Sequence, residues 1–162
     1  IKAQYNLGLM YAYGKGVDKD PIAAIKWYRL SAEQGYADAQ YNLGVSSIDG
    51  LGVPQDYKEA FKLIQLASEL GDGYAQNNLG IMYEKGTGVP QDDKEAVKWW
   101  KLAAKQGLAE AQFHLGLMQL GKLGVTQDYQ EDTEDHKEAE KWMRLSAEQE
   151  HERAQFNLDN YA

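Results

Sequence analysis

Residues 3–8 read Ala-Gln-Tyr-Asn-Leu-Gly, and the same pattern returns at residues 39–44, 75–80 and 111–116, always after 36 residues. A fifth copy follows 43 residues after the fourth, at residues 154–159, and carries Asp159 where the other copies have glycine. A fixed period of this length is typical of stacked arrays, in which each unit buries its apolar face against its neighbours. The repeat predicts one array over residues 1–162, with units at about 1–36, 37–72, 73–108 and 109–151 and a half-unit at 152–162.

Each unit has the pattern of two helices joined by a loop. In the second unit, helical spacing covers residues 37–49, and Gly50 to Pro54 then interrupts it. Asp56 and Glu59 have the spacing of a capping box, and Gly71 follows the second helix as a C-terminal glycine. The second helix carries an apolar stripe at i, i+3, i+4 and i+7, made of Ala60, Leu63, Ile64 and Ala67. Four such units and a half-unit predict an all-α fold with nine helices and no strand.

The glycine at the sixth place of the motif stands in the middle of the first helix, at Gly8, Gly44, Gly80 and Gly116. A glycine inside a helix costs roughly 1 kcal/mol relative to alanine. Its return at one place indicates a neighbouring helix that passes too close for a β-carbon. Asp159 in the fifth copy then indicates either a helix that closes the array or an imperfect repeat with more chain beyond it.

The fourth unit contains an insertion, which accounts for its longer spacing. Two capping boxes compete there, Asp128 with Glu131 and Asp135 with Glu138. We expect the helix to begin near His136, with an exposed acidic loop near residues 129–136; the alternative is a helix extended from Asp128. Such a loop could be simply solvated, or it could meet a basic partner or a divalent cation.

Composition limits the classes of function. The net charge of -8 argues against a nucleic-acid-binding surface, because Lys and Arg neutralise phosphates. The chain has no cysteine, which excludes disulfides and thiolate catalysis but does not fix the compartment. No stretch resembles a signal peptide or a membrane span, so we expect no membrane insertion. Because Ile1 lies inside a repeat unit, we expect the chain to be a piece or a processed form of a longer protein.

Signals for catalysis are poor. His151-Glu152 begins like the zinc-protease motif His-Glu-x-x-His, but Gln155 stands where the second histidine is needed. His136 and Glu140 could share a helix face, yet two ligands are too few for a metal site. The glycine loops lack the Lys-Ser/Thr of a phosphate-binding loop. We therefore expect no enzyme activity, no cofactor and no metal.

The chain resembles the Sel-one-like repeat family, a branch of the tetratricopeptide-like superfamily, in three recurring motifs. These are Ala-Gln-x-x-Leu-Gly, a Gly-x-Gly-Val loop at residues 14–17, 50–53 and 86–89, and a closing Ala-Glu-Gln-Gly at residues 32–35. Residues 52–60 look most like bacterial members. The resemblance covers essentially the whole chain and implies a right-handed superhelix that acts as an adaptor and holds a partner in its concave groove.

A helical wheel of the first helix places Ala3 and Leu7 toward the partner helix and Tyr5 on the opposite side. In tetratricopeptide-like arrays that opposite face lines the concave wall, and the resemblance implies that an asparagine at the Asn6 place grips a peptide backbone. We predict a groove that binds a protein or peptide, with these candidate residues: Asn6, Asp38, Tyr41, Asn42, Tyr74, Asn77, Asn78, Lys85, Phe113, His114 and Asn157. His114 replaces asparagine in its unit and leaves a gap in the ladder. The alternative is that the asparagines bond within the fold or to water.

The predicted function is a non-catalytic protein-interaction scaffold. Two rivals stay open at this point. One is an enzyme or enzyme accessory that acts on a cell-wall or peptide ligand, and the other is a structural spacer in a longer chain. Neither the partner nor the oligomeric state follows from the sequence.

Overall fold

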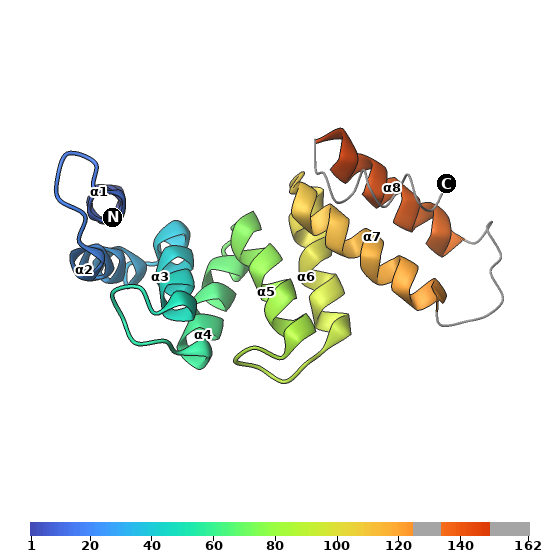
Figure 1. Ribbon diagram of the computed structural model, residues 1–162, viewed down its shortest axis with the longest axis horizontal. Coiled ribbons are helices and arrows are strands. Elements are labelled where there is room, and N and C mark those ends of the chain that lie inside the picture. The colour runs from blue at the N-terminus through green and yellow to red at the C-terminus, as the bar shows by residue number, and fades with distance from the viewer. Residues whose placement is uncertain (125–133, 150–162) are drawn as a thin grey trace. The chain divides into compact units, whose positions relative to one another are not determined.

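The computed structural model describes residues 1–124 and 134–149, and all regular structure within them is helical (Figure 1). Eight helices lie in these residues: α1 (Lys2–Tyr13), α2 (Pro21–Ala32), α3 (Ala37–Asp49), α4 (Tyr57–Glu69), α5 (Gly73–Lys85), α6 (Asp93–Lys105), α7 (Ala109–Gly124) and α8 (Glu134–Glu148). The all-α prediction is confirmed. The ninth predicted helix, with Asp159, falls outside the described residues.

The second helix of each of the first three units begins at an aspartate. The Asp56 carboxylate accepts hydrogen bonds from the backbone N–H groups of Lys58 and Glu59 at 2.9 and 3.0 Å. Asp20 and Asp92 cap α2 and α6 in the same way. Each cap supplies acceptors for backbone donors that have no partner inside the helix. The predicted helix starts are thus confirmed.

The cap residues also tie the two helices of a unit together. The backbone N–H of each aspartate donates to a carbonyl of the preceding first helix, from Asp20 to Tyr11, from Asp56 to Ser47 and from Asp92 to Tyr83, at 2.9 to 3.0 Å. In a full capping box the glutamate three residues later would accept this N–H. Here a backbone carbonyl accepts it, so the cap also sets the position of the second helix on the first.

Glycines in the loop after the first helix allow a close contact with the preceding unit. Gly50 ends α3 in the left-handed conformation, with φ of +69°. Two residues on, Gly52 has φ of +75°, and a β-carbon there would lie 2.5 Å from the carbonyl oxygen of Pro21 at the start of α2. Only glycine fits both the backbone angle and the approach.

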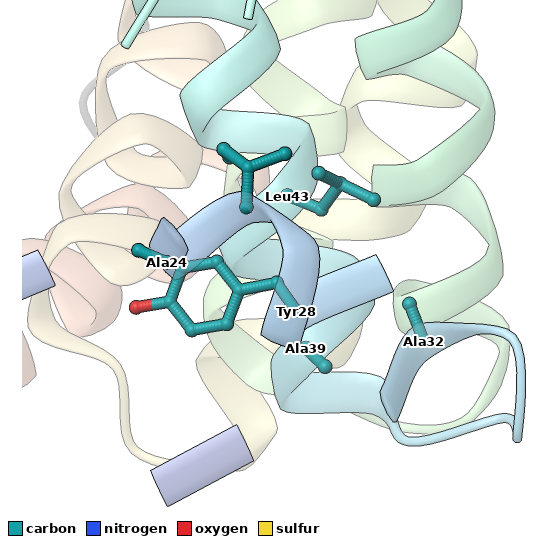
Figure 2. Packing of buried hydrophobic residues seen from close by; sticks show 6 residues of the cluster. Ala24, Tyr28, Ala32, Ala39 and Leu43 are labelled. Atoms are coloured by element: carbon teal, nitrogen blue, oxygen red, sulfur yellow. The ribbon is translucent and has the colours of Figure 1, made fainter. Parts of the chain in front are cut away.

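The chain divides into two compact units, Ile1–Ala96 and a second that begins at Val97. In the first, each helix packs against the next, from α1 through α5. Its core between α2 and α3 consists of Ala24, Ile25, Tyr28, Ala32, Ala39 and Leu43, with Tyr28 in the middle of the cluster (Figure 2). In the second, α7 packs against α8, and Phe113 and Met143 are buried together.

The mid-helix glycines lie where the two helices of a unit touch. A β-carbon on Gly8 would lie 2.6 Å from the Tyr28 ring, and one on Gly44 would lie 2.7 Å from Cγ1 of Ile64. The equivalent distance from Gly116 to Cγ of Met143 is 2.8 Å. At these three places the predicted close approach of a neighbouring helix is confirmed, and the neighbour is the second helix of the same unit.

The fourth unit differs from the other units on both sides of its insertion. Its first helix, α7, continues through Gly121 to Gly124, whereas the first helices of the other units end at a glycine that opens the loop. Its second helix begins at Glu134, two residues before His136. Residues 129–133 of the predicted loop lie outside the described residues. Within residues 1–124 and 134–149, no helix has the length and apolar character needed to cross a membrane.

Candidate functional site

Asparagines of the motif form hydrogen bonds to tyrosines of the preceding unit. Nδ2 of Asn42 donates to the Tyr5 hydroxyl at 3.0 Å, and Nδ2 of Asn78 donates to the Tyr41 hydroxyl at 3.3 Å. Both pairs span 37 residues, so the same contact joins α1 to α3 and α3 to α5. The interpretation that these asparagines bond within the fold therefore describes Asn42 and Asn78. We call these two contacts the Tyr–Asn pairs.

The Tyr5–Asn42 pair keeps hydrogen-bonding capacity after this bond is made. The contact uses one amide hydrogen of Asn42, and an asparagine also has a carbonyl oxygen that accepts. The Tyr5 oxygen accepts in this bond, so its own hydrogen can be donated elsewhere. Burial raises the pKa of Tyr5, and the Asp38 carboxylate raises it further, so the hydroxyl stays protonated at neutral pH. One donor and one acceptor side by side match the groups of a peptide backbone.

Aromatic rings surround the first pair and continue toward the second. The Tyr5 ring lies 5.1 Å from the Tyr36 ring in an edge-to-face arrangement, and Tyr41 lies 6.4 Å from Tyr74 between ring centres. Such geometries are favourable for aromatic pairs. Tyr74 is 65% exposed, so this cluster presents an aromatic surface to solvent. A hydrogen bond with Asp38 is the main cause of the raised pKa of Tyr36.

A cavity of about 550 Å³ lies beside Asn78. It is lined by the end of α3, the start of α4, the second half of α5 and the loop that follows, through Ile48, Tyr57, Asn78, Ile81, Met82, Lys85, Gly86 and Thr87. The volume falls within the range of ligand pockets, and the walls combine apolar side chains with a few polar groups. Of the predicted site residues, Asn78 and Lys85 line this Asn78 cavity.

The structure does not bring all the predicted residues to one surface. Asn77 and Phe113 are only 4% exposed each. His114 belongs to the second compact unit, where its ring stacks on that of Trp100 at 4.8 Å. Asn6 is exposed on α1, and Asn157 lies outside the described residues. A helical wheel treats one helix alone, so it cannot show that neighbouring helices cover the third place of the motif at Asn77 and Phe113.

Among the lining residues that were not predicted, Tyr57 and Ile48 come from outside α5 and the loop that follows it. Tyr57 is the first residue of α4, and Ile48 lies near the end of α3. The pattern of the first helix carries no signal for a residue contributed by the second helix. The recurring loop glycines were the available clue, since they bring the loop and the start of the second helix close together.

The described residues also bear on the chemistry that the sequence left open. Among them, no group of three or more His, Cys, Asp or Glu side chains is placed to hold a metal ion. The side chain of His136 and the whole of His151 lie outside the described part of the chain. His114 contacts Trp100 and, at 6.0 Å between ring centres, Phe113.

A family model described as "Sel1 repeat" matches residues 1–36, 37–72, 73–108 and 109–151. The chain belongs to the Sel1 repeat family. Its fold is the all-α Sel1 repeat solenoid, and Sel1 repeat proteins generally mediate protein–protein interactions. Members of the family are typically interaction scaffolds rather than enzymes.

Solved structures with Sel1 repeats are similar to this chain. A protective antigen of uropathogenic Escherichia coli that displays an SLR fold is 42% identical, with a TM-score of 0.81, over 91% of this chain and 30% of that one. A Sel1 repeat protein from Oxalobacter formigenes is 36% identical, with a TM-score of 0.77, over 91% of this chain and 58% of that one. This chain therefore spans about a third of the length of the Escherichia coli antigen and somewhat more than half of the length of the Oxalobacter formigenes protein.

A more distant neighbour shares the fold alone. The immunity protein Pa5087 from Pseudomonas aeruginosa is 24% identical, with a TM-score of 0.57, over 94% of this chain and 54% of that one. A comparison with curated proteins gave no match to this Sel1 repeat chain.

Proposed function

We propose that this Sel1 repeat chain is a non-catalytic scaffold that binds an extended peptide segment of a partner protein along its first helices. The observation that supports this most is the repetition of the Tyr–Asn pair, Tyr5 with Asn42 and Tyr41 with Asn78. An extended peptide presents backbone donors and acceptors at regular intervals, and the Tyr5 hydroxyl and the amides of Asn42 and Asn78 offer groups to match them.

Side-chain selectivity would come from the surroundings of the pairs. The Asn78 cavity has room for an apolar side chain against Ile48, Ile81 and Met82. Lys85 lies at one edge of the cavity and would favour an acidic neighbour in the peptide, whereas Asp38 beside Tyr36 would favour a basic one. Charges at the rim of an interface contribute more to selectivity than to affinity.

Asn77 and Phe113 are buried, so the proposed site does not include them as residues that contact the ligand. A ligand would contact the Tyr–Asn pairs, Tyr74 and the Asn78 cavity, all of which lie in the first compact unit. Asn77 would then support the site from beneath, since its side chain is buried.

Photo-cross-linking tests which face binds. Peptides would be selected from a random displayed library against the purified chain, and benzoylphenylalanine would be placed either at Tyr74 or at Lys62 on the outer side of α4. We expect the selected peptides to cross-link from position 74. A selection in which no peptide cross-links from position 74 would contradict the proposed site on the first helices.

A further inference from the structure

The glutamine at the second place of the motif links each unit to the one before it. Nε2 of Gln40 donates to the carbonyl oxygen of Ala32 at 3.3 Å. Gln76 makes the same bond to Ser68 at 3.1 Å, and Gln112 makes it to Ala104 at 3.3 Å. Each bond spans eight residues and reaches back to the end of the preceding second helix. Because Nε2 is a donor in this bond, the orientation of the amide is fixed.

The other end of this amide has a partner in the first and fourth units but not in the second. Oε1 of Gln4 accepts from Gln34 at 2.6 Å, and Oε1 of Gln112 accepts from Gln149 at 2.9 Å. Oε1 of Gln40 is buried and has no hydrogen-bond partner among the described residues. The cause is visible in the sequence, since Leu70 occupies the place of Gln34 in the second unit and cannot donate.

The Gln40 side chain is only 6% exposed and lines a groove between α2 and α4, with α3 beneath it. The groove encloses about 460 Å³, and its apolar walls include Leu43, Leu63 and Leu66. The three helices follow one another in the first compact unit (Figure 1). We call this the α2–α4 groove, and it does not include any residue of the Tyr–Asn pairs.

The charge around the α2–α4 groove is mainly negative. Glu33, Asp56 and Glu59 line it, with Arg29 as the one basic residue among its lining side chains. The Asp56 carboxylate is engaged at the start of α4, and Glu59 lies 3.8 Å from Lys62 across the exposed surface of that helix. A basic group on a ligand would therefore be attracted to the rim at Glu33 and Glu59.

A buried acceptor without a hydrogen bond, such as Oε1 of Gln40, lowers the stability of the fold. A ligand that donates a hydrogen bond to this oxygen would remove that cost when it binds. Leu70 is 58% exposed and continues the Glu59, Leu63 and Leu66 stripe of α4 by one turn. Few contacts hold an exposed side chain in place, so a ligand can displace the Leu70 side chain. The ligand then reaches Oε1 of Gln40 from the position that glutamine occupies in the first and fourth units.

We propose that the α2–α4 groove binds a short segment of a partner protein that combines apolar and basic side chains. A backbone N–H of the segment donates to Oε1 of Gln40, its apolar side chains cover Leu43, Leu63 and Leu66, and its basic side chain lies near Glu33 and Glu59. This second site is independent of the one on the first helices, so the scaffold can hold two segments at once.

The Leu70→Gln variant tests the proposal, because it supplies within the chain the donor that the ligand would bring. The matched control is Leu70→Met, which keeps an apolar side chain and brings no donor. The probe is the capped peptide acetyl-Leu-Lys-Leu-Lys-amide, titrated into the full chain while the methyl signals of Leu43, Leu63 and Leu66 are followed by nuclear magnetic resonance. Its counterpart acetyl-Leu-Glu-Leu-Glu-amide keeps the apolar groups and reverses the charge.

We expect the basic peptide to shift these methyl signals in the parent chain and in Leu70→Met. In Leu70→Gln its affinity should fall on the order of fivefold, which corresponds to one hydrogen bond. The acidic peptide should leave the signals unchanged. The proposal is overturned if the basic peptide shifts none of the three leucines, if both peptides bind equally, or if Leu70→Gln binds as tightly as the parent.

Discussion

At the scale of single residues, a substitution at one place of the repeat changes the hydrogen bonding of a residue that lies far away in the sequence. Leu70 stands where the first unit has Gln34, and the effect falls on Gln40, whose carbonyl oxygen loses its donor. A buried polar atom without a partner costs about 1–3 kcal/mol. The second unit therefore gives up stability that the first unit retains.

Replacing Leu70 with glutamine should return that stability. Leu70 is largely exposed, so its loss removes little buried apolar surface, and the new amide can donate to Oε1 of Gln40. We expect the free energy of unfolding to rise by about 1 kcal/mol. Urea unfolding followed by circular dichroism measures the change, with Leu70→Met as the control. A variant no more stable than this control would mean that the amide does not reach Gln40.

Replacing a mid-helix glycine with alanine should change the free energy of unfolding by an amount that depends on which atoms the new methyl group meets. At Gly44 the added methyl group meets Cγ1 of Ile64 at 2.7 Å and the backbone oxygen of Ala60 at 3.3 Å, and the backbone cannot easily move. We expect Gly44→Ala to lose about 1–2 kcal/mol of unfolding free energy, although alanine favours the helix.

Gly116→Ala is the matched variant. The atoms that its methyl group would meet belong to the flexible side chain of Met143, the nearest at 2.8 Å, and this chain can turn away. Its stability should stay within about 0.5 kcal/mol of the parent. Urea unfolding of both variants provides the comparison. Equal losses would contradict the view that the rigidity of the neighbour decides the cost.

At the scale of elements, the packing of α2 against α1 and α3 encloses a titratable group. Tyr28 is 4% exposed in the core between α2 and α3, and its ring lies 5.9 Å from that of Tyr5 on α1. Burial raises the pKa of Tyr28 to about 12, with smaller contributions from Tyr5 and Tyr13. The core therefore holds this hydroxyl in its neutral form.

Stability should fall at alkaline pH for this reason. An unfolded tyrosine loses its proton near pH 10, whereas folded Tyr28 keeps it until about pH 12. Below pH 10 the stabilisation is complete, and it is lost as the pH rises from about 10 to 12, by up to about 2–3 kcal/mol. Urea unfolding of the parent and of Tyr28→Phe across this range measures the difference. Curves that stay parallel would show that Tyr28 does not titrate in this way.

The sequence predicted the elements well because local signals determine them. The caps Asp20, Asp56 and Asp92 and the breaks at the loop glycines act over a few residues, and the structure confirms them. The described part of α8 begins at Glu134, close to the start that we expected near His136. Glycine is a weaker signal in the fourth unit, where Gly121 lies inside α7 rather than at its end.

The candidate site was less predictable, since it depends on contacts between units. The asparagine positions were found from the repeat, but their bonds to Tyr5 and Tyr41 join residues 37 apart and have no local signal. Burial of Asn77 and the contribution of Tyr57 to the Asn78 cavity likewise arise only when helices stack. The sequence shows that Leu70 stands where other units have glutamine. Its effect on Gln40 becomes apparent only from the hydrogen bonds that Gln34 and Gln149 make in the first and fourth units.

At the scale of the whole molecule, repetition explains both stability and the proposed function. Contacts between neighbouring units recur along the chain, so the side chains that join two units also recur at regular intervals along the array. The Tyr–Asn pairs hold the first helices of neighbouring units together. In the proposed function, the amides of Asn42 and Asn78 would also contact the backbone of a bound peptide. The net charge of -8 adds attraction for basic partners, which salt should weaken.

The most direct test of the central claim is the affinity of a selected peptide for three versions of the chain, measured by isothermal titration calorimetry. In Asn42→Ala with Asn78→Ala we expect binding weaker by about tenfold or more, because two hydrogen bonds to the peptide backbone are lost. Thermal unfolding of this variant would be recorded beside it, to show that the helices remain folded at the temperature of the titration. In Lys58→Ala with Lys62→Ala, on the outer side of α4, the affinity should match the parent. Unchanged binding to the asparagine variant, together with a loss in the lysine variant, would place the ligand on the second helices and contradict the account.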